Sequence, residues 1–152
     1  MDLSDQVVIV TGAGQGIGKA AALALADAGA DVVVVDINER TLAETAAAVK
    51  AKGRRTLAIR ADLGSVAEID RMVAESVAAF GRIDTLVNNA GVTRRAYIMD
   101  LTEEDWDRIH RVNAKGVFFC LQRVAREMIP RSSGRIINIA SVAGKGFPGT
   151  SN

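Results

Sequence analysis

Residues 11–18 read Thr11-Gly12-Ala13-Gly14-Gln15-Gly16-Ile17-Gly18, directly after an apolar run and directly before a helical pattern. A glycine-rich turn between a strand and a helix lets the backbone approach a pyrophosphate closely, and it places that anion at the helix N-terminus. The spacing G-x-G-x-x-G does not fit this stretch, whereas T-G-x-x-x-G-x-G does. We therefore predict a dinucleotide site here rather than a purely structural turn. The residues assigned to it are Gly12, Gln15, Gly16, Ile17 and Gly18.

Short apolar runs rich in Val and Ile alternate along the chain with helical patterns. The runs are residues 7–10, 32–35, 57–59, 83–87 and 136–139. Runs that are apolar at successive positions are typical of strands buried on both faces of a parallel sheet. The helical patterns run from 16 to 28, from 38 to a stop at 53, from 65 to a stop at 81, and from 102 to 128. This alternation predicts a doubly wound, Rossmann-type α/β sheet with helices on both faces, in a single domain over residues 1–152 whose C-terminal part is missing.

Composition narrows the class of protein. With 49% hydrophobic and 24% charged residues, the 152-residue chain is not disordered. A net charge of +1 gives no field that would attract nucleic acid or an anionic membrane. A lone Cys120 permits no internal disulfide, and a lone His110 provides no metal-ligand cluster. No signal peptide or membrane span is present in the sequence, so we expect a soluble, cytoplasmic protein.

Asp36 ends the second apolar run, about 20 residues beyond the glycine loop. A carboxylate at this place can hold the adenosine ribose hydroxyls of NAD, and its charge would repel the additional phosphate of NADP. An Asp at a strand end is also an ordinary helix cap, and Asp36 alone leaves both interpretations open. Together with the loop, Asp36 favours NAD over NADP, and its neighbour Ile37 is assigned to the same cofactor site. Gln15 adds no cation to the loop, although Arg40 lies nearby in the sequence.

Polar residues also follow the third and fourth apolar runs, at the edge where open α/β sheets bind ligands. Asp62 and Leu63 follow the third, and the Asp62 side chain could reach an adenine or simply begin a turn before Gly64. The stretch Asn88-Asn89-Ala90-Gly91 follows the fourth. Its amides could tie neighbouring loops together while its small residues let a ribose lie against the backbone, or the stretch could be an Asx-type turn. We assign Asn89, Ala90 and Gly91 to the cofactor site.

The third helical pattern begins with Ser65 and Glu68, which predict a capping box. The fourth pattern is expected to be one continuous helix, and Asn113 falls on its apolar stripe. That stripe consists of Trp106, Ile109, Val117, Cys120 and Val124. A polar amide that points into a core costs a few kcal/mol unless its hydrogen bonds are met. Asn113 is therefore either locked to backbone groups or part of a buried polar site. We favour the second interpretation, because Gly116 has no side chain and so lets another segment approach the helix closely.

Ser141 closes the fifth apolar run, again at the carboxyl edge of the predicted sheet. Its hydroxyl could donate to a substrate oxygen or cap a turn. No G-x-S-x-G motif occurs, which argues against a hydrolase nucleophile. The segment 92–101, which contains Tyr97 and Met99, follows the fourth run and is expected to line the mouth of the site.

Taken together, these residues resemble the N-terminal part of a short-chain dehydrogenase/reductase, as far as its fifth strand. The matches are Thr11 to Gly18 with the T-G-x-x-x-G-x-G loop, Asp62-Leu63 with the adenine contact, Asn88 to Gly91 with N-N-A-G, Asn113 with the catalytic-helix asparagine and Ser141 with the catalytic serine. The resemblance implies hydride transfer between a nicotinamide cofactor and a carbonyl or secondary alcohol. It also implies that Ser141 holds the substrate oxygen, that Asn113 holds a water through its backbone in a proton relay, and that the full-length protein is a homo-oligomer, a dimer or a tetramer.

One departure from the family pattern matters for the chemistry. The acid/base of this family is a Tyr within Tyr-x-x-x-Lys, about a dozen or more residues beyond the serine. Eleven residues follow Ser141 and none is Tyr, and Tyr97 is the only tyrosine in the sequence. General acid/base catalysis supplies a factor of about 10² to 10⁴. We therefore expect the 152 residues to be catalytically inactive by themselves. They would be either the N-terminal part of a longer NAD-dependent oxidoreductase or a truncated nucleotide-binding module.

Overall fold

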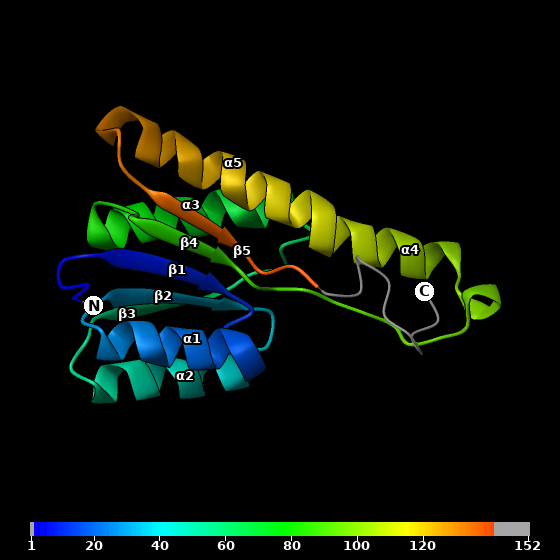
Figure 1. Ribbon diagram of the computed structural model, residues 1–152, viewed down its shortest axis with the longest axis horizontal. Helices are drawn as coiled ribbons and strands as arrows, with labels where there is room; N and C mark the ends of the chain where they lie inside the picture. The colour runs from blue at the N-terminus through cyan, green and yellow to red at the C-terminus, as the bar shows by residue number, and fades with distance from the viewer. Residues whose placement is uncertain (1, 142–152) are drawn as a thin grey trace.

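The computed structural model describes residues 2–141, which form a five-stranded parallel sheet and its connecting helices (Figure 1). The strands are β1 (Val7–Thr11), β2 (Asp31–Asp36), β3 (Thr56–Arg60), β4 (Thr85–Asn88) and β5 (Arg135–Asn138). The α-helices are α1 (Gly16–Asp27), α2 (Glu39–Ala51), α3 (Val66–Phe80), α4 (Glu103–His110) and α5 (Val117–Met128). Shorter helical segments are η1 (Ile98–Asp100), the π-helical η2 (Arg111–Gly116) and η3 (Ile129–Arg131). Each predicted strand is confirmed to within two residues at either end.

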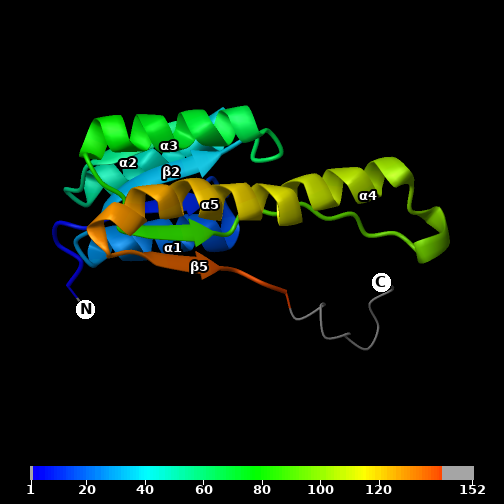
Figure 2. The ribbon, with the colours of Figure 1, turned by 90° about the horizontal axis from the view of Figure 1, so that it is seen from above.

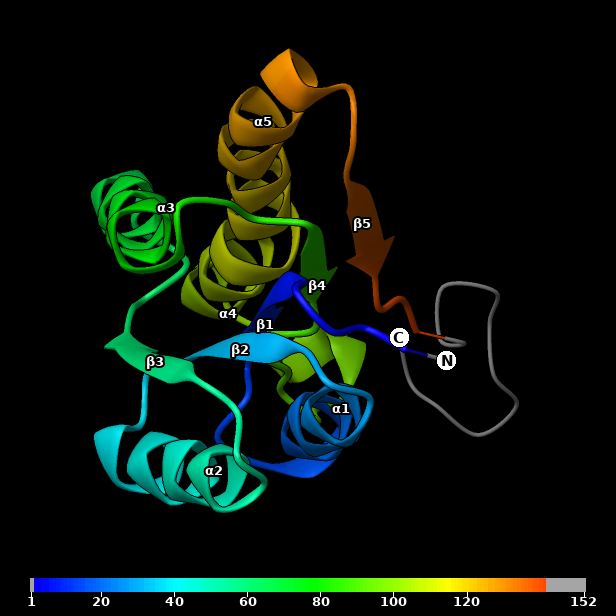
Figure 3. The same ribbon diagram turned by 90° about the vertical axis from the view of Figure 1, so that its left-hand side faces the viewer.

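The strand order is β3-β2-β1-β4-β5, and each neighbouring pair is parallel. The chain moves outward from β1 to β3 and then returns to place β4 on the other side of β1. Helices α1 and α2 cover one face of the sheet, and α3 and α5 cover the other (Figure 3). The predicted doubly wound, Rossmann-type fold is therefore confirmed, and its topological switch point lies between β1 and β4.

Two cores lie on opposite faces of the sheet because successive strand residues point in opposite directions. Val7 and Ile9 of β1 pack in the core beneath α3 and α5, whereas Val8 and Val10 pack in the core beneath α1 and α2. Every residue of β1 is buried, as the unbroken apolar run predicts. The prediction fails at the edge strands, since β5 pairs on one side only within the described residues and its Ile137 is 46% exposed.

Side-chain caps define the starts of three helices. The Asn38 side chain accepts a hydrogen bond from the Thr41 amide at the start of α2, and Thr102 caps α4 through a full capping box. The capping box predicted for α3 is only half formed. Ser65 Oγ accepts from the Glu68 amide at 3.4 Å, but the Glu68 carboxylate turns to the Asp62 amide at 2.9 Å. The second half of the box is not formed because the Ser65 amide already donates to the Asp62 carbonyl at 3.0 Å.

The predicted helix over 102–128 is found over residues 103–128, but it is not α-helical throughout. It is interrupted by the π-helical segment η2, which carries more residues per turn than an α-helix and so rotates α4 relative to α5. The α4 end projects beyond the strands, as Figures 1 and 2 show, where no sheet covers it. Trp106 is accordingly 64% exposed and stacks on His110, while Cys120 and Val124 of α5 are fully buried. The apolar stripe of the sequence therefore does not continue into α4.

Candidate functional site

An open cleft of about 460 Å³ lies where β1, β2, β3 and β4 end. This volume lies within the range of ligand-binding clefts, and the carboxyl edge at a switch point is where open α/β sheets bind ligands. Of the predicted cofactor residues, all but Gly18 line the cleft, namely Gly12, Gln15, Gly16, Ile17, Asp36, Ile37, Asp62, Leu63, Asn89, Ala90 and Gly91. Sequence reasoning missed four other lining residues, which are Val35, Ala61, Val92 and Val112.

The glycines of the loop are needed for different reasons. Gly12 and Gly16 have φ of +65° and +53°, in the left-handed region that favours glycine. A Cβ on Gly12 would also lie 2.8 Å from Ala90 Cα, and a Cβ on Gly18 would collide with the Gly12 carbonyl. Around Gly16 there is open space. The loop therefore packs tightly against the end of β4 on its inner side and leaves its backbone open to the cleft at Gly16.

The α1 N-terminus differs from the starts of α2, α3 and α4. Its N-cap residue, Gln15, makes no side-chain hydrogen bond to the first turn, whereas α2, α3 and α4 begin with side-chain caps. The first backbone N–H groups of a helix have no intrahelical acceptor, and together with the helix dipole they attract anions. Because Gln15 and Gly16 line the cleft, this end of α1 fits a diphosphate.

Thr11 joins the glycine loop to the end of β4. Its hydroxyl accepts hydrogen bonds from the amides of Asn89 at 3.0 Å and Ala90 at 3.1 Å, and donates to the Val87 carbonyl at 3.3 Å. The Asn89 side-chain amide returns to the Thr11 carbonyl at 3.0 Å. The prediction that amides here tie neighbouring loops together is confirmed. The part played by Thr11 itself was missed, although a hydroxyl residue at the end of a central strand is a usable signal.

Asp36 is held at the rim of the cleft by backbone donors alone. Its carboxylate accepts hydrogen bonds from the Gly14 amide at 2.8 Å and from the Asn38 amide at 3.0 Å. Within the described residues it makes no ion pair, since Arg40 pairs instead with Glu44 at 2.7 Å on the outer face of α2. The Asp36 carboxylate therefore lies beside the cleft without a paired cation among the described residues.

Asp62 forms the predicted turn and lies at the cleft, while its contact with an adenine stays a prediction. Its Oδ1 accepts from the Gly64 amide at 2.8 Å, which is the turn-forming interaction, and the residue also lines the cleft. Arg111 of η2 approaches its Oδ2 at 3.9 Å from the other side. Leu63 lies under η2, where a Cβ on Gly116 would be 2.5 Å from its carbonyl oxygen. The close neighbour that Gly116 was expected to admit is therefore Leu63.

Asn113 is not buried, contrary to the favoured interpretation. Its side chain is exposed, and its amide group makes two hydrogen bonds with the backbone of a single residue, Val92. Nδ2 donates to the Val92 carbonyl and Oδ1 accepts from the Val92 amide, each at 2.8 Å. The first interpretation, an amide locked to backbone groups, is the correct one. The rotation introduced by η2 brings Val112 to the cleft and leaves Asn113 to fix the segment after β4.

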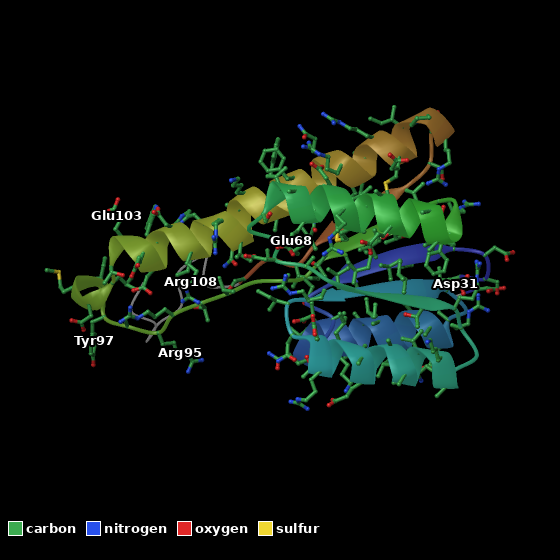
Figure 4. The ribbon with its side chains drawn as sticks, turned by 180° about the vertical axis from the view of Figure 1, so that it is seen from behind. Asp31, Glu68, Arg95, Tyr97, Glu103 and Arg108 are labelled. Atoms are coloured by element: carbon green, nitrogen blue, oxygen red, sulfur yellow. The ribbon has the colours of Figure 1, made fainter. Side chains whose placement is uncertain are left out.

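The remaining predicted residues do not line the cleft. Ser141, the last described residue, is exposed beyond β5. Of the segment 92–101, only Val92 lines the cleft, so the expected mouth is not formed by this segment in the described chain. Tyr97 is 75% exposed on the projecting end of the molecule, away from the sheet (Figure 4).

Other reactive chemistry is not found in the described part of the chain. Burial raises the pKa of the Cys120 thiol to about 12, so it stays protonated and a poor nucleophile. Across residues 2–141, no three His, Cys, Asp or Glu side chains gather where they could hold a metal ion. No helix of that same stretch is long and apolar enough to cross a membrane.

Comparison with known sequences gives consistent matches. A family model described as short chain dehydrogenase matches residues 6–152. The chain is 44% identical over 149 residues to the (2S)-[(R)-hydroxy(phenyl)methyl]succinyl-CoA dehydrogenase subunit BbsD of Thauera aromatica, covering 98% of this chain and 60% of that protein. It is also 44% identical over 152 residues to a 3-oxoacyl-[acyl-carrier-protein] reductase of Synechocystis sp., covering 99% of this chain and 62% of that protein.

Solved structures give the same picture. NAD+-bound xylitol dehydrogenase superposes with a TM-score of 0.94 at 36% identity, covering 99% of this chain and 58% of that chain. Levodione reductase superposes with a TM-score of 0.93 at 33% identity, covering 99% of this chain and 59% of that chain. The chain thus spans about 60% of the length of the relatives that it matches.

Proposed function

The chain belongs to the short-chain dehydrogenase family, and from this premise we propose that it is the dinucleotide-binding part of an NAD(P)-dependent oxidoreductase. The observation that supports the binding role is the cleft at the switch point, lined by the glycine loop and by the uncapped end of α1. A diphosphate placed there would receive backbone N–H donors and the positive end of the helix dipole. When bound, the nicotinamide would supply or accept the hydride.

NAD is the proposed cofactor, in preference to NADP. Asp36 carries a charge at the cleft rim that no cation in the described chain offsets, and such a carboxylate can accept hydrogen bonds from two ribose hydroxyls. The additional phosphate of NADP would meet that negative charge, which is unfavourable at short distance. Arg40, the nearest basic residue in the sequence, is already engaged by Glu44.

The proposed reaction is hydride transfer between the nicotinamide and a carbonyl or secondary alcohol, carried out by a protein that also contains Tyr-x-x-x-Lys. The matched relatives are named as dehydrogenases and reductases. We propose that Ser141 holds the substrate oxygen and that the backbone at Asn113 holds a water. The motif Tyr-x-x-x-Lys does not occur in the 152 residues, so these residues by themselves should bind dinucleotide without turnover. Homo-oligomerisation stays a prediction.

The test is the binding of NADH and NADPH to this chain and to Asp36→Ala, followed by nicotinamide fluorescence. The original chain should bind NADH more tightly, and Asp36→Ala should weaken NADH binding about tenfold while NADPH binding is unchanged or improves, since one charge-assisted pair is lost and a repulsion is removed. Asp27→Ala is the matched control, because Asp27 is an exposed aspartate paired with Lys52 away from the cleft. Equal affinity of the original chain for both cofactors would contradict the NAD assignment, and no binding of either would contradict the dinucleotide site.

A further inference from the structure

Gly14 lies where the glycine loop contacts the turn that joins β2 to α2, and we call this contact the seam. It is buried and does not line the cleft, unlike Gln15 and Gly16 beside it. Its amide donates to Asp36 Oδ2 at 2.8 Å, while Asp36 Oδ1 accepts from the Asn38 amide at 3.0 Å. One donor from each side of the seam therefore fixes the carboxylate that faces the cleft.

The seam has no room for a side chain at Gly14. A Cβ there would lie 2.9 Å from Asp36 Oδ2 and 3.0 Å from Asp36 Cγ, and closer still to Thr41 Oγ1. Real Cβ atoms essentially never approach other atoms below 3.0 Å. Gly14 is not among the glycines with positive φ, so its backbone conformation is open to any residue. The atoms in the way all belong to the side chains of Asp36 and Thr41, so a side chain at position 14 would have to displace them.

The groups around Gly14 differ in how easily they could move to make room for a side chain. The Ala13 amide continues the sheet ladder by donating to the Val35 carbonyl at 3.0 Å, which fixes the loop. Thr41 belongs to the first turn of α2, where its amide donates to the Asn38 side chain at 3.2 Å and its hydroxyl to the Asn38 carbonyl at 3.3 Å. The Asp36 side chain is the part with open space beside it, on the cleft side. A Cβ at position 14 would therefore displace the Asp36 carboxylate.

We propose that Gly14 is a positioning residue that sets the place of the Asp36 carboxylate and thereby the preference of the cleft for NAD over NADP. This inference rests on the proposed function, since it concerns the same cleft. Gly14 does not line the cleft, so its influence on cofactor choice must pass through Asp36. A side chain at position 14 removes the amide-to-carboxylate geometry and moves the negative charge away from the ribose position.

A double-mutant cycle separates this indirect role from a general effect of the substitution. NADH and NADPH affinities are measured by fluorescence for the original chain, Gly14→Ala, Asp36→Ala and the double variant. Gly14→Ala should lower NADH affinity about tenfold, the size expected for one charge-assisted hydrogen bond, with NADPH affinity changed much less. In the Asp36→Ala background, Gly14→Ala should leave the NADH-to-NADPH ratio unchanged. Gly53→Ala is the control, because Gly53 has a φ of +76°, so the substitution strains the backbone far from the cleft and should preserve the ratio.

The results separate this inference from the function on which it rests. If the original chain prefers NADH and Gly14→Ala keeps that ratio, Gly14 does not position Asp36, although the proposed function survives. If the original chain binds neither cofactor, the proposed function itself has failed. Should Gly14→Ala not fold, as judged by circular dichroism, Gly14→Ala with Thr41→Ala removes the closest clash and leaves the contact with Asp36. That double variant must also lose the preference for NADH, and a retained preference would overturn the proposal.

Discussion

Strand β2 begins and ends with an aspartate, and the two differ in their hydrogen-bond partners. Asp31, at the amino end, is 3% exposed and accepts hydrogen bonds from Arg54 at 3.0 Å and from Arg55 Nε at 2.8 Å. Asp36, at the carboxyl end, has only backbone amides against it and makes no ion pair with the described residues. A carboxylate whose charge is matched by arginines stabilises the fold. A carboxylate left with its charge beside a cleft is available to a ligand.

The same division holds along the two edges of the sheet. At the amino edge, Asp84 just before β4 pairs with Arg82 at 2.6 Å and Arg131 at 3.2 Å, and accepts from the Val7 amide at 2.9 Å. Asp31 lies at this end, on the opposite side of the molecule from Tyr97 (Figure 4). At the carboxyl edge, ion pairs lie near the end of β3, where Arg60 pairs with Glu68 at 3.2 Å and Arg111 approaches Asp62 at 3.9 Å. The ends of β1, β2 and β4 present glycines, amides and the unpaired Asp36, which are polar groups that a dinucleotide would use.

The largest expected effect is a difference in the free energy of unfolding between variants of the two aspartates of β2. Asp31→Ala should lower the free energy of unfolding by about 3 kcal/mol, because it removes the buried acceptor of hydrogen bonds from the Arg54 and Arg55 side chains and from the Arg55 amide. Asp36→Ala should cost less than about 1 kcal/mol, since water can reach the amides that it leaves. Urea unfolding of both variants measures the difference. An equal loss of unfolding free energy in the two variants would contradict the distinction between a structural and a ligand-binding aspartate.

A pair of threonines sharpens the comparison between the edges. Thr11→Val, at the carboxyl end of β1, should cost about 2 kcal/mol and weaken NADH binding, because the amides of Asn89 and Ala90 lose their acceptor. Thr56→Val, at the amino end of β3, removes only one donation to the Val32 carbonyl and should cost about 1 kcal/mol. NADH titration and urea unfolding are measured for both variants. Weaker NADH binding in Thr56→Val would show that the edges are not independent.

The smallest effect is a pH dependence at the amino edge. Burial alone would raise the pKa of Asp84, but hydrogen bonds from Arg82, Val7 and Arg131 outweigh it and hold the pKa below its ordinary value. The stabilisation is therefore complete above about pH 4 and is lost as the pH falls through the lowered pKa. Asp84→Asn should be less stable than the original chain at about pH 6, and its stability should fall less steeply as the pH is lowered to about 3. Parallel acid slopes for the two proteins would show that Asp84 does not carry this dependence.

Much of the site could be predicted because its residues follow strand ends. Parallel strands bring their carboxyl ends to one edge, so Asp36, Asp62 and Asn89 had to converge once the alternation of strands and helices was recognised. Gly12 and Gly16 carry their own signal, since few other residues adopt their backbone conformation. These predictions depend on local patterns and on one general rule of topology.

The features that could not be predicted depend on contacts between distant segments. The π-helical η2 shifts the side chains of α4 relative to those of α5, and no local pattern in the sequence marks it. Its Gly116 packs against the Leu63 carbonyl, which belongs to a distant segment. Glu68 forms only half of the expected cap because the turn at Asp62 competes for its carboxylate. Asn113 finds its partner in Val92, 21 residues away.

The sequence by itself determined the order of strands and helices, the glycine loop and the set of residues at the carboxyl edge. Local conformational preference and hydrophobic periodicity suffice for these, since each is encoded within a few neighbouring residues. The tertiary structure alone decided which aspartate is neutralised, how Gly14 confines Asp36, and which way η2 turns its side chains. Those outcomes depend on which side chains meet across the sheet and on how much space remains between them, and both are set only when distant segments pack together.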